Sequence, residues 1–208
     1  RDRVLARARI GGDDRLAAAL AEATAHVHEQ DFLNLMGGLS SSRGAIRVLI
    51  ERHAGIDGLE QAVHDRFGVD LAATVDGLCL AASDDGAFEP SGIRQAAAAM
   101  LQGSKTDQAR GQVIADWLAA AARERAGAIG AYLTVFFTQA GEERKKLINK
   151  DAATIDPAAP DVLSAESGRL ADLQARIRAV IVVRATVALL RLGDALLAEY
   201  ERIKRERA

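Results

Sequence analysis

The sequence predicts an all-α protein, an irregular helical bundle that ends in a long C-terminal helix. Alanine and leucine dominate a composition that is 49% hydrophobic, whereas only 4% of the residues are aromatic and only 3 are prolines. Such a composition favours packed helices over sheets. Apolar residues also recur at helical spacing along most of the chain, and glycines or polar clusters interrupt the pattern.

A length of 208 residues suits one ordinary domain or two small ones. We expect a single helical subdomain over residues 1–208. The clearest internal loop is "SDDGAFEPSG", residues 83–92. This loop suggests an alternative division into a looser N-terminal half, 1–85, and a C-terminal half, 90–208.

The first half of the chain predicts a series of short helices. Their apolar stripes lie at residues 4–10, 16–27, 32–39, 43–54, 56–67 and 71–82. Asp13 or Asp14 is suited to cap the second helix, and Ser40 to Ser42 supply caps for the fourth. Gly55 and Gly68 follow the fourth and fifth helices, where glycine commonly ends a helix.

The second half predicts helices at residues 90–103 and 106–125, a short apolar element at residues 129–137, and one long helix from Arg169 to Arg207 with a candidate bend at Gly193. A basic turn and the loop "DAATIDPAAPD", residues 151–161, precede the long helix. Both chain ends lie in charge-rich helix without caps. We therefore expect an excised segment of a larger protein.

The charge balance limits the kinds of partner. Lys and Arg number 27 against 29 Asp and Glu, so the formal charge is −2 and a polyanion site must be a local patch. Arg184 and Arg191 interrupt the most apolar run, residues 179–192, which is shorter than the about 20 apolar residues that span a bilayer. We expect no membrane contact, and a structural ion pair at Arg184.

The single cysteine, Cys79, excludes an internal disulfide and suits a cytoplasmic protein. Leu78 and Leu80 flank it, so we expect a buried thiol and not a nucleophile.

No motif predicts a catalytic residue, a cofactor site or a metal site in this chain. "QGSKT", residues 102–106, resembles a phosphate-binding loop only superficially, because its required glycines would fall on Ala99 and Ser104 if Lys105 were its lysine. None of the histidines has a partner at metal-ligand spacing: His26, His28, His53 and His64.

The stretch "FFTQAGEERKKLINKD", residues 136–151, is the leading candidate for a binding site. From Glu142 to Lys150 it carries four cations and two carboxylates, a local excess of +2. Such cations neutralise phosphates by releasing counterions, and a preceding glycine lets a backbone approach closely. A solvated helix start explains the same residues.

Two stretches carry a family resemblance. One is the match in "YLTVFFTQAGEERKKLINK" to a Phe-Leu-Thr, Gly, Arg-Lys, Leu, Lys signature, through Phe137, Thr138, Gly141, Arg144, Lys145, Leu147 and Lys150. The other is the helix "LLAEYERIKRERA", where a Tyr, Lys and small-residue pattern is matched by Tyr200, Lys204 and Ala208. The helix resembles one found in UvrD-like superfamily 1 DNA helicases. The first stretch resembles the 1B subdomain of AddA, the helicase-nuclease subunit of bacterial AddAB and a UvrD/RecB-like member of that superfamily. The chain departs from the signature with Phe136-Phe137-Thr138 for Phe-Leu-Thr, and with Glu143 where proline is common.

The resemblance implies an accessory helical insertion in an ATP-dependent DNA helicase and exonuclease for double-strand-break repair and recombination. Its implied partners are double- and single-stranded DNA and an AddB-like subunit, while ATP and Mg would bind elsewhere in the parent protein. The first four expected contacts to the DNA backbone are Arg144, Lys145, Lys146 and Lys150. Further candidates are Lys105, Arg110, Lys204 and Arg205.

Two other functions are compatible with an all-α chain of this length. A ligand-responsive transcription regulator would need an N-terminal helix-turn-helix with a basic recognition helix, and the first 50 residues offer few base-reading side chains. A protein-protein interaction module without nucleic acid is favoured by the near-neutral charge.

Overall fold

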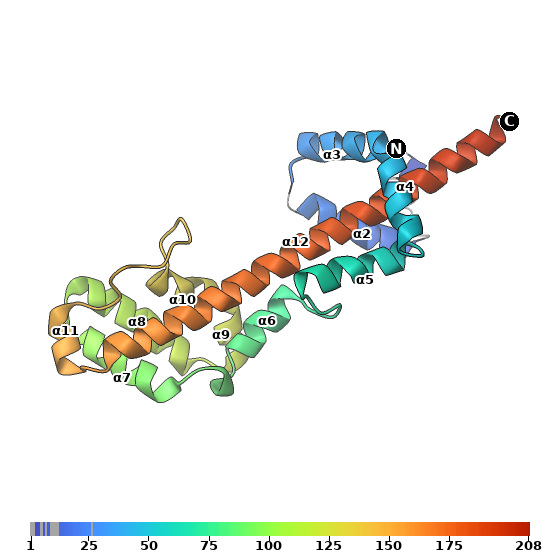
Figure 1. The fold of residues 1–208 in the computed structure, drawn as a ribbon. Helices are drawn as coiled ribbons and strands as arrows, with labels where there is room; N and C mark the ends of the chain where they lie inside the picture. The colour runs from blue at the N-terminus through green and yellow to red at the C-terminus, as the bar shows by residue number, and fades with distance from the viewer. Residues whose placement is uncertain (1–2, 5, 7, 9–12, 26) are drawn as a thin grey trace. The chain divides into compact units, whose positions relative to one another are not determined.

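The computed structural model describes residues 3, 4, 6, 8, 13–25 and 27–208 (Figure 1). Within these residues the regular structure is entirely helical, so the prediction of an all-α fold is confirmed. The chain divides into two compact units. Unit 1 contains the described residues up to Ala72 together with Ala179–Ala208, and unit 2 is Ala73–Arg178.

This division does not follow the loop at residues 83–92. It falls after Ala72 and again within the last helix, because residues 179–208 pack with the beginning of the chain. That the whole chain acts as one subdomain stays a prediction.

Among the described residues, unit 1 contains four short helices with defined bounds and the C-terminal part of a long one. These are α2 (Asp14–Ala25), α3 (Glu29–Ser41), α4 (Arg43–Arg52), α5 (Ile56–Phe67) and α12 (Ala159–Glu206). Leu16, Ala19 and Ala23 recur at helical spacing on α2 and are buried against Met36 of α3 and Leu192 of α12. Unit 1 therefore has a core made mainly of aliphatic and small side chains, to which Phe32 adds an aromatic ring.

Several local predictions for unit 1 are confirmed. Asp13 caps α2, since its Oδ1 accepts the backbone N–H of Leu16 at 3.1 Å. Helix α5 has the predicted bounds, and Gly68 follows it in the left-handed conformation with φ 61°. The predicted helix at residues 4–10 includes Leu5 and Ile10, which, like His26, lie outside the described residues.

The predicted serine caps of α4 are wrong. Ser42 occupies the N-cap position but makes no side-chain cap hydrogen bond. Ser40 and Ser41 instead donate their hydroxyls to carbonyl oxygens of the preceding helix, α3, at 2.8 Å each, a common alternative for serine near a helix end. Helix α4 ends at Arg52, before the predicted glycine, and Ala54 takes a positive φ of 57°.

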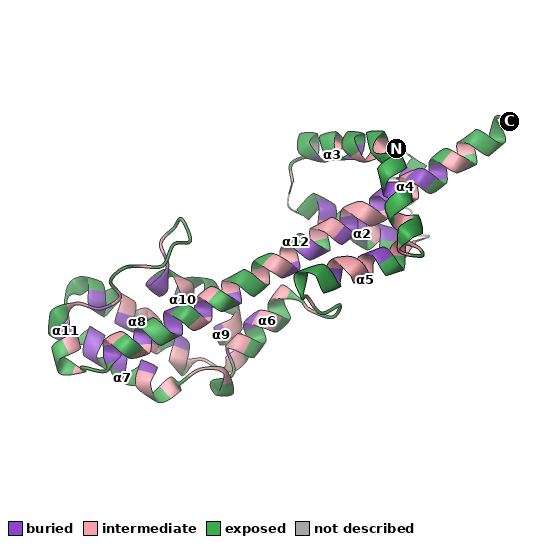
Figure 2. Cartoon of the chain, in the orientation of Figure 1, coloured by how far each residue is buried: buried purple, intermediate pink, exposed green. Residues whose placement is uncertain are grey.

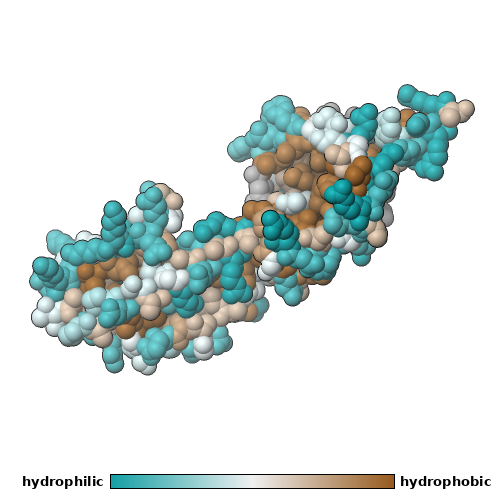
Figure 3. Space-filling view, in the orientation of Figure 1, coloured by the Kyte–Doolittle hydropathy of each residue, from teal (hydrophilic) through white to brown (hydrophobic). Residues whose placement is uncertain are grey.

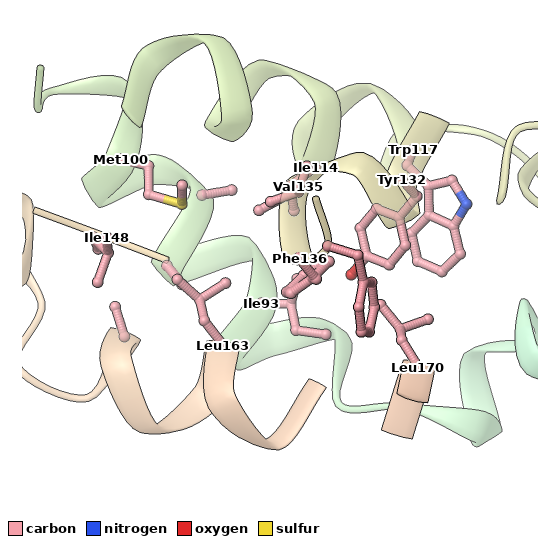
Figure 4. Packing of buried hydrophobic residues seen from close by; sticks show 14 of the residues in the cluster. Ile93, Met100, Ile114, Trp117, Tyr132, Val135, Phe136, Ile148, Leu163 and Leu170 are labelled. Carbon is pink, nitrogen blue, oxygen red and sulfur yellow. The ribbon is translucent and has the colours of Figure 1, made fainter. Parts of the chain in front are cut away.

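Unit 2 contains shorter helices and the first part of α12. They are α6 (Val75–Ala82), the 3-10 helix η1 (Asp85–Ala87), α7 (Pro90–Leu101), α8 (Lys105–Ala119), α9 (Ala122–Gly127), α10 (Ile129–Phe136) and α11 (Lys150–Ile155). Figure 2 shows buried segments on α7 and α8. The aromatic core lies on α8 and α10, where Trp117 stacks on Tyr132 with ring centroids 3.9 Å apart and Phe136 packs edge-on against Tyr132 (Figure 4).

A buried polar cluster accompanies these rings. Tyr132 donates its hydroxyl to Glu166 at 3.0 Å, and Glu166 pairs with Arg169 at 2.6 Å. Arg169 also donates to the carbonyl oxygen of Ala82 at 2.9 Å. Burial and the charge of Glu166 raise the pKa of Tyr132 far above its ordinary value. The cluster satisfies polar groups that would be costly to bury alone.

Three helix predictions for unit 2 are wrong. Helix α6 begins at Val75, four residues later than expected, because the Thr74 hydroxyl caps it through the N–H of Gly77. The predicted helix at 106–125 is interrupted at Ala120 and Ala121, which are extended. The predicted loop at 151–161 contains most of α11 and the start of α12, which begins at Ala159 and runs unbroken through Gly193.

Two single residues behave as predicted. Arg184 donates to Glu22 at 2.8 Å with its side chain 44% exposed, so it forms a structural ion pair. Cys79 is buried, and burial raises the pKa of its thiol. No helix in the described parts of the chain has the length and apolar character required to cross a bilayer.

Candidate nucleic-acid interface

The basic segment follows a tight hairpin at the end of α10. Phe137 and Glu143 form an antiparallel bridge, and the Thr138 N–H donates to the Glu142 carbonyl at 2.8 Å. The Gly141 N–H donates to the Thr138 carbonyl at 3.0 Å, and Gly141 has φ 79°. A left-handed glycine is typical of three-residue hairpin loops. The hairpin reverses the chain and brings Arg144 back against α10.

Arg144 is anchored to the last turn of α10. Its backbone N–H donates to the Phe136 carbonyl at 2.8 Å, and its Nε donates to the Thr134 carbonyl at 3.2 Å. A cation at this point satisfies carbonyls that a helix C-terminus leaves without partners. Arg144 is half-buried as a result. Its position is therefore determined by the fold.

Two side chains of α8 position the rest of the segment. Arg110 donates from Nη1 to the carbonyl oxygens of Lys146 and Leu147, both at 3.2 Å. Asp107 accepts the backbone N–H of Asn149 at 3.2 Å and its side-chain N–H at 2.8 Å. The backbone from residue 146 to residue 149 is therefore tied to one helix.

The electrostatics of these two anchors differ. Asp107 is 1% exposed; burial works to raise its pKa, but hydrogen bonds from Ser104 and Asn149 outweigh it and lower the pKa below its ordinary value. For Arg110, whose charged form is the protonated one, burial lowers the pKa, and the nearby charge of Arg144 lowers it further. The ionised Asp107 thus helps to stabilise a loop that carries an excess of positive charge.

The side chains of three lysines take no part in these anchoring hydrogen bonds. Lys145, Lys146 and Lys150 are exposed, and none forms an ion pair with a carboxylate of the described residues. A cleft of about 310 Å³ lies beside them, between residues 143–150 and the beginning of α12. Its charged lining residues are Glu143, Arg144, Lys145, Lys146 and Lys150, an excess of +3. A wall of this kind favours an anion.

Comparison of the chain with protein-family models, curated proteins and solved structures found no match. The case for a nucleic-acid contact therefore rests on residues 143–150 and on the sequence resemblance.

The further candidates lie in different environments. Lys105 is exposed at the start of α8 but does not line the cleft, and Arg110 is occupied by the two carbonyls. Lys204 and Arg205 belong to unit 1, near the end of α12. Arg205 donates to the Glu201 carbonyl at 3.3 Å. Of these four, Arg110 is the residue that directly supports the basic segment.

Asp107 and Asn149 were not predicted as site residues from the sequence. Ser104 and Asp107 form a capping box at the start of α8, and this pattern is readable as Ser-x-x-Asp. The bond from Asp107 to Asn149 spans 42 residues and has no local signal. The same capping box explains "QGSKT" as a helix start, and no group of three metal-ligating side chains gathers within the described ranges.

Proposed function

We propose that residues 143–150 contact the phosphate backbone of DNA, as part of an accessory subdomain of a cytoplasmic ATP-dependent DNA helicase-nuclease acting in double-strand-break repair. The observation that carries the proposal is the display of Lys145, Lys146 and Lys150 on a backbone tied to α8 by Asp107 and Arg110. A fixed backbone supports binding because less conformational freedom is lost when the ligand arrives. The helicase-nuclease part rests on the sequence resemblance alone.

The contact would position DNA without reading its sequence. Lys and Arg pair with phosphate oxygens that are the same at every base pair, so they set register and affinity but not specificity. ATP, Mg and the nuclease chemistry would belong to other parts of the parent protein, and an AddB-like subunit would be its partner. No catalytic step is assigned to residues of this chain.

The test is fluorescence-anisotropy titration of the chain with a labelled duplex that has a single-stranded tail, at low salt. The variant Lys145→Glu/Lys146→Glu/Lys150→Glu is expected to bind at least about tenfold more weakly, because three phosphate contacts become repulsive. Lys150→Glu also places a carboxylate in the first turn of α11, where it favours the helix. Loss of binding would therefore not reflect loss of that helix.

A matched control carries the same charge change elsewhere in unit 2. Arg94→Glu/Arg123→Glu/Arg176→Glu reverses three exposed cations that do not line the cleft. Its affinity is expected to stay within about threefold of the parent chain, since it changes only the net charge. Equal weakening of both variants, or no binding by the parent chain at low salt, would overturn the assignment of residues 143–150.

A protein-contact role is the second candidate, because unit 1 exposes large apolar side chains. Figure 3 shows apolar surface in the region of α3 and α12. Near the end of α5, Phe67 is 50% exposed and Leu71 is 57% exposed. Large exposed apolar patches commonly mark protein interfaces. Sedimentation of the unaltered chain and of Phe67→Ser/Leu71→Ser tests this role for contacts between copies of the chain. Self-association that the double variant abolishes would support the role. A monomer in both cases would exclude these two side chains as a self-association surface.

A further inference from the structure

A second groove lies within unit 1, between the start of α4 and the last turns of α12. Its volume is about 370 Å³, in the range of small-ligand sites. The lining residues that could meet a ligand are Arg43, Gly44, Arg47, Tyr200, Glu201 and Lys204. Tyr200 and Lys204 lie 153 to 161 positions from Arg43 and Arg47 in the sequence. The fold nevertheless places the guanidinium of Arg43 over the ring of Tyr200. The groove is thus a product of tertiary packing.

The groove has a positive lining. Three cations face one carboxylate, an excess of +2. Arg47 forms an ion pair with Glu201, so its charge is largely compensated. The positive charges that remain for an anion are those of Arg43 and Lys204, both of which are exposed. Arg43 uses one nitrogen on the Ser40 carbonyl at 3.0 Å and keeps further N–H donors.

An aromatic ring lies beside these charges. Tyr200 is 46% exposed, and the guanidinium carbon of Arg43 lies 5.0 Å from its ring centroid. A guanidinium over one side of a ring restrains the ring through a cation–π contact. Exposed aromatic rings next to cations form the stacking platforms of single-strand binding surfaces, because every base has a π-face.

We propose that this groove binds one nucleotide of a single-stranded nucleic acid, with the base stacked on Tyr200 and the phosphate paired with Arg43 and Lys204. An acidic peptide would use the cations but leave the ring of Tyr200 without a matching planar partner. A double helix would keep its bases stacked on each other and away from the ring. The proposal does not depend on the DNA contact at residues 143–150, because the two sites share no residue.

Gly44 allows the groove to be blocked without disturbing the helix. A Cβ added at Gly44 would meet no atom within 4 Å, so a larger side chain there extends into open space. Gly44 lies in the first turn of α4, where glutamate has better helix propensity than glycine and interacts favourably with the helix dipole. Gly44→Glu therefore adds a carboxylate to the groove while favouring α4. Gly37→Glu is the matched control, since Gly37 is also open, lies on α3 and does not line the groove.

The test uses the 208-residue chain with Lys145→Glu/Lys146→Glu/Lys150→Glu already in place, so that the unit 2 segment does not contribute. Its affinity for a fluorescein-labelled oligothymidylate is measured by anisotropy and compared with that for an abasic strand of equal length. Tyr200→Ala is expected to weaken oligothymidylate binding about 5- to 150-fold, whereas Tyr200→Phe keeps the stacking surface and stays within about twofold. Gly44→Glu is expected to weaken binding at least about tenfold, and Gly37→Glu to leave it nearly unchanged.

The abasic strand separates stacking from charge. The chain with the three lysine substitutions and its Tyr200→Ala variant should bind the abasic strand with similar affinity. The chain with the three lysine substitutions alone should bind oligothymidylate more tightly than the abasic strand. The proposal would be overturned if the chain with the three lysine substitutions bound both strands with equal affinity. It would also be overturned if its Tyr200→Ala and Tyr200→Phe variants bound oligothymidylate equally well. Displacement of the oligonucleotide by thymidine monophosphate at the same nucleotide concentration would contradict a strand as the ligand and assign the groove to a free nucleotide.

Discussion

The two units of this chain are both helical, but their cores differ in kind. Unit 2 buries Trp117, Tyr132 and Phe136 in a stacked aromatic group, each at 3% exposure or less. The core of unit 1 includes the ring of Phe32 but is otherwise made of aliphatic, alanine and methionine side chains, for example Ala19 and Ala23. An aromatic side chain buries about 150–250 Å², far more than alanine can. Each of these three aromatic residues therefore contributes more hydrophobic stabilisation than a core alanine of unit 1.

Unit 1 relies more on charged contacts between its helices. Its interhelical ion pairs include the exposed pairs of Arg47 with Glu201 and Arg15 with Asp57, and the less exposed pair of Arg191 with Glu60. Exposed pairs of this type contribute little individually and are weakened by salt. The comparison indicates that unit 2 is stabilised mainly by packing, whereas unit 1 responds more to pH and ionic strength.

Truncation of a core ring should have the largest effect. Phe136 is fully buried, so Phe136→Ala is expected to destabilise unit 2 by about 3–5 kcal/mol, through lost burial and the cavity left behind. Urea unfolding followed by the fluorescence of Trp117, the single tryptophan, measures this change. Phe67→Ala, at a half-exposed ring of unit 1, should change the free energy of unfolding of unit 1, measured by amide hydrogen exchange of α5, by about 0.5 kcal/mol or less. Equal losses in the two variants would remove the proposed dependence of unit 2 on its aromatic core.

Two helical glycines provide a smaller contrast. A Cβ at Gly111 would lie 3.0 Å from the Ala97 carbonyl oxygen and 3.0 Å from the Met100 Cβ, so α7 and α8 would have to separate. Gly111→Ala should cost about 1–3 kcal/mol. At Gly193 the nearest atom is the flexible end of Ile46, at 3.1 Å, and alanine gains about 1 kcal/mol of helix propensity.

Gly193→Ala should therefore leave stability unchanged or slightly raised. Thermal unfolding followed by circular dichroism compares the two variants. A larger loss for Gly193→Ala than for Gly111→Ala would mean that the tighter packing lies in unit 1.

The smallest expected effect is a pH dependence in unit 1. A hydrogen bond from Arg202 lowers the pKa of Glu199 from 4.5 to about 2, against the opposing effect of burial, with further help from the charge of Arg202 and from Arg3. Because the folded-state pKa lies below the unfolded value, this stabilisation is present above about pH 4.5 and is lost as the pH falls towards about 2. Glu199→Gln should reduce the pH dependence of unit 1 in that window.

Amide hydrogen exchange of α2 and α5 at several pH values measures this effect within unit 1. Reading unit 1 separately matters because the pKa of Asp107 in unit 2 is also lowered. Glu51→Gln removes an exposed carboxylate of α4 and is the control. The same pH profile for Glu199→Gln and Glu51→Gln would contradict a special role for Glu199.

The helices with local signals were predictable, and those determined by distant contacts were not. Helix α5 follows from its apolar stripe and from Gly68. The break after α8 falls at Ala120 and Ala121, which have high helix propensity, and is accompanied by the bond from Arg125 Nε to the Ala120 carbonyl. The start of α12 was missed because it falls in the predicted loop at residues 151–161. This segment contains Pro160, and proline is tolerated in the first turn of a helix.

The same distinction holds for the candidate sites. The cations of residues 144–150 are adjacent in the sequence and could be recognised there. Their anchors, Asp107 and Arg110, come from α8, and the pairing of Arg43 with Tyr200 joins opposite ends of the chain. Periodicity contains no information on such contacts, because it describes one helix at a time.

The salt dependence of DNA binding tests the central claim, the phosphate contact of residues 143–150, most directly. Each neutralised phosphate of a duplex contributes about −0.9 to the slope of log K against log salt concentration. Lys145→Glu/Lys146→Glu/Lys150→Glu should therefore reduce the magnitude of the slope by about 2.7, while Arg94→Glu/Arg123→Glu/Arg176→Glu keeps the parent slope. An unchanged slope in the lysine variant would contradict the account, because those side chains would then release no counterions when DNA binds.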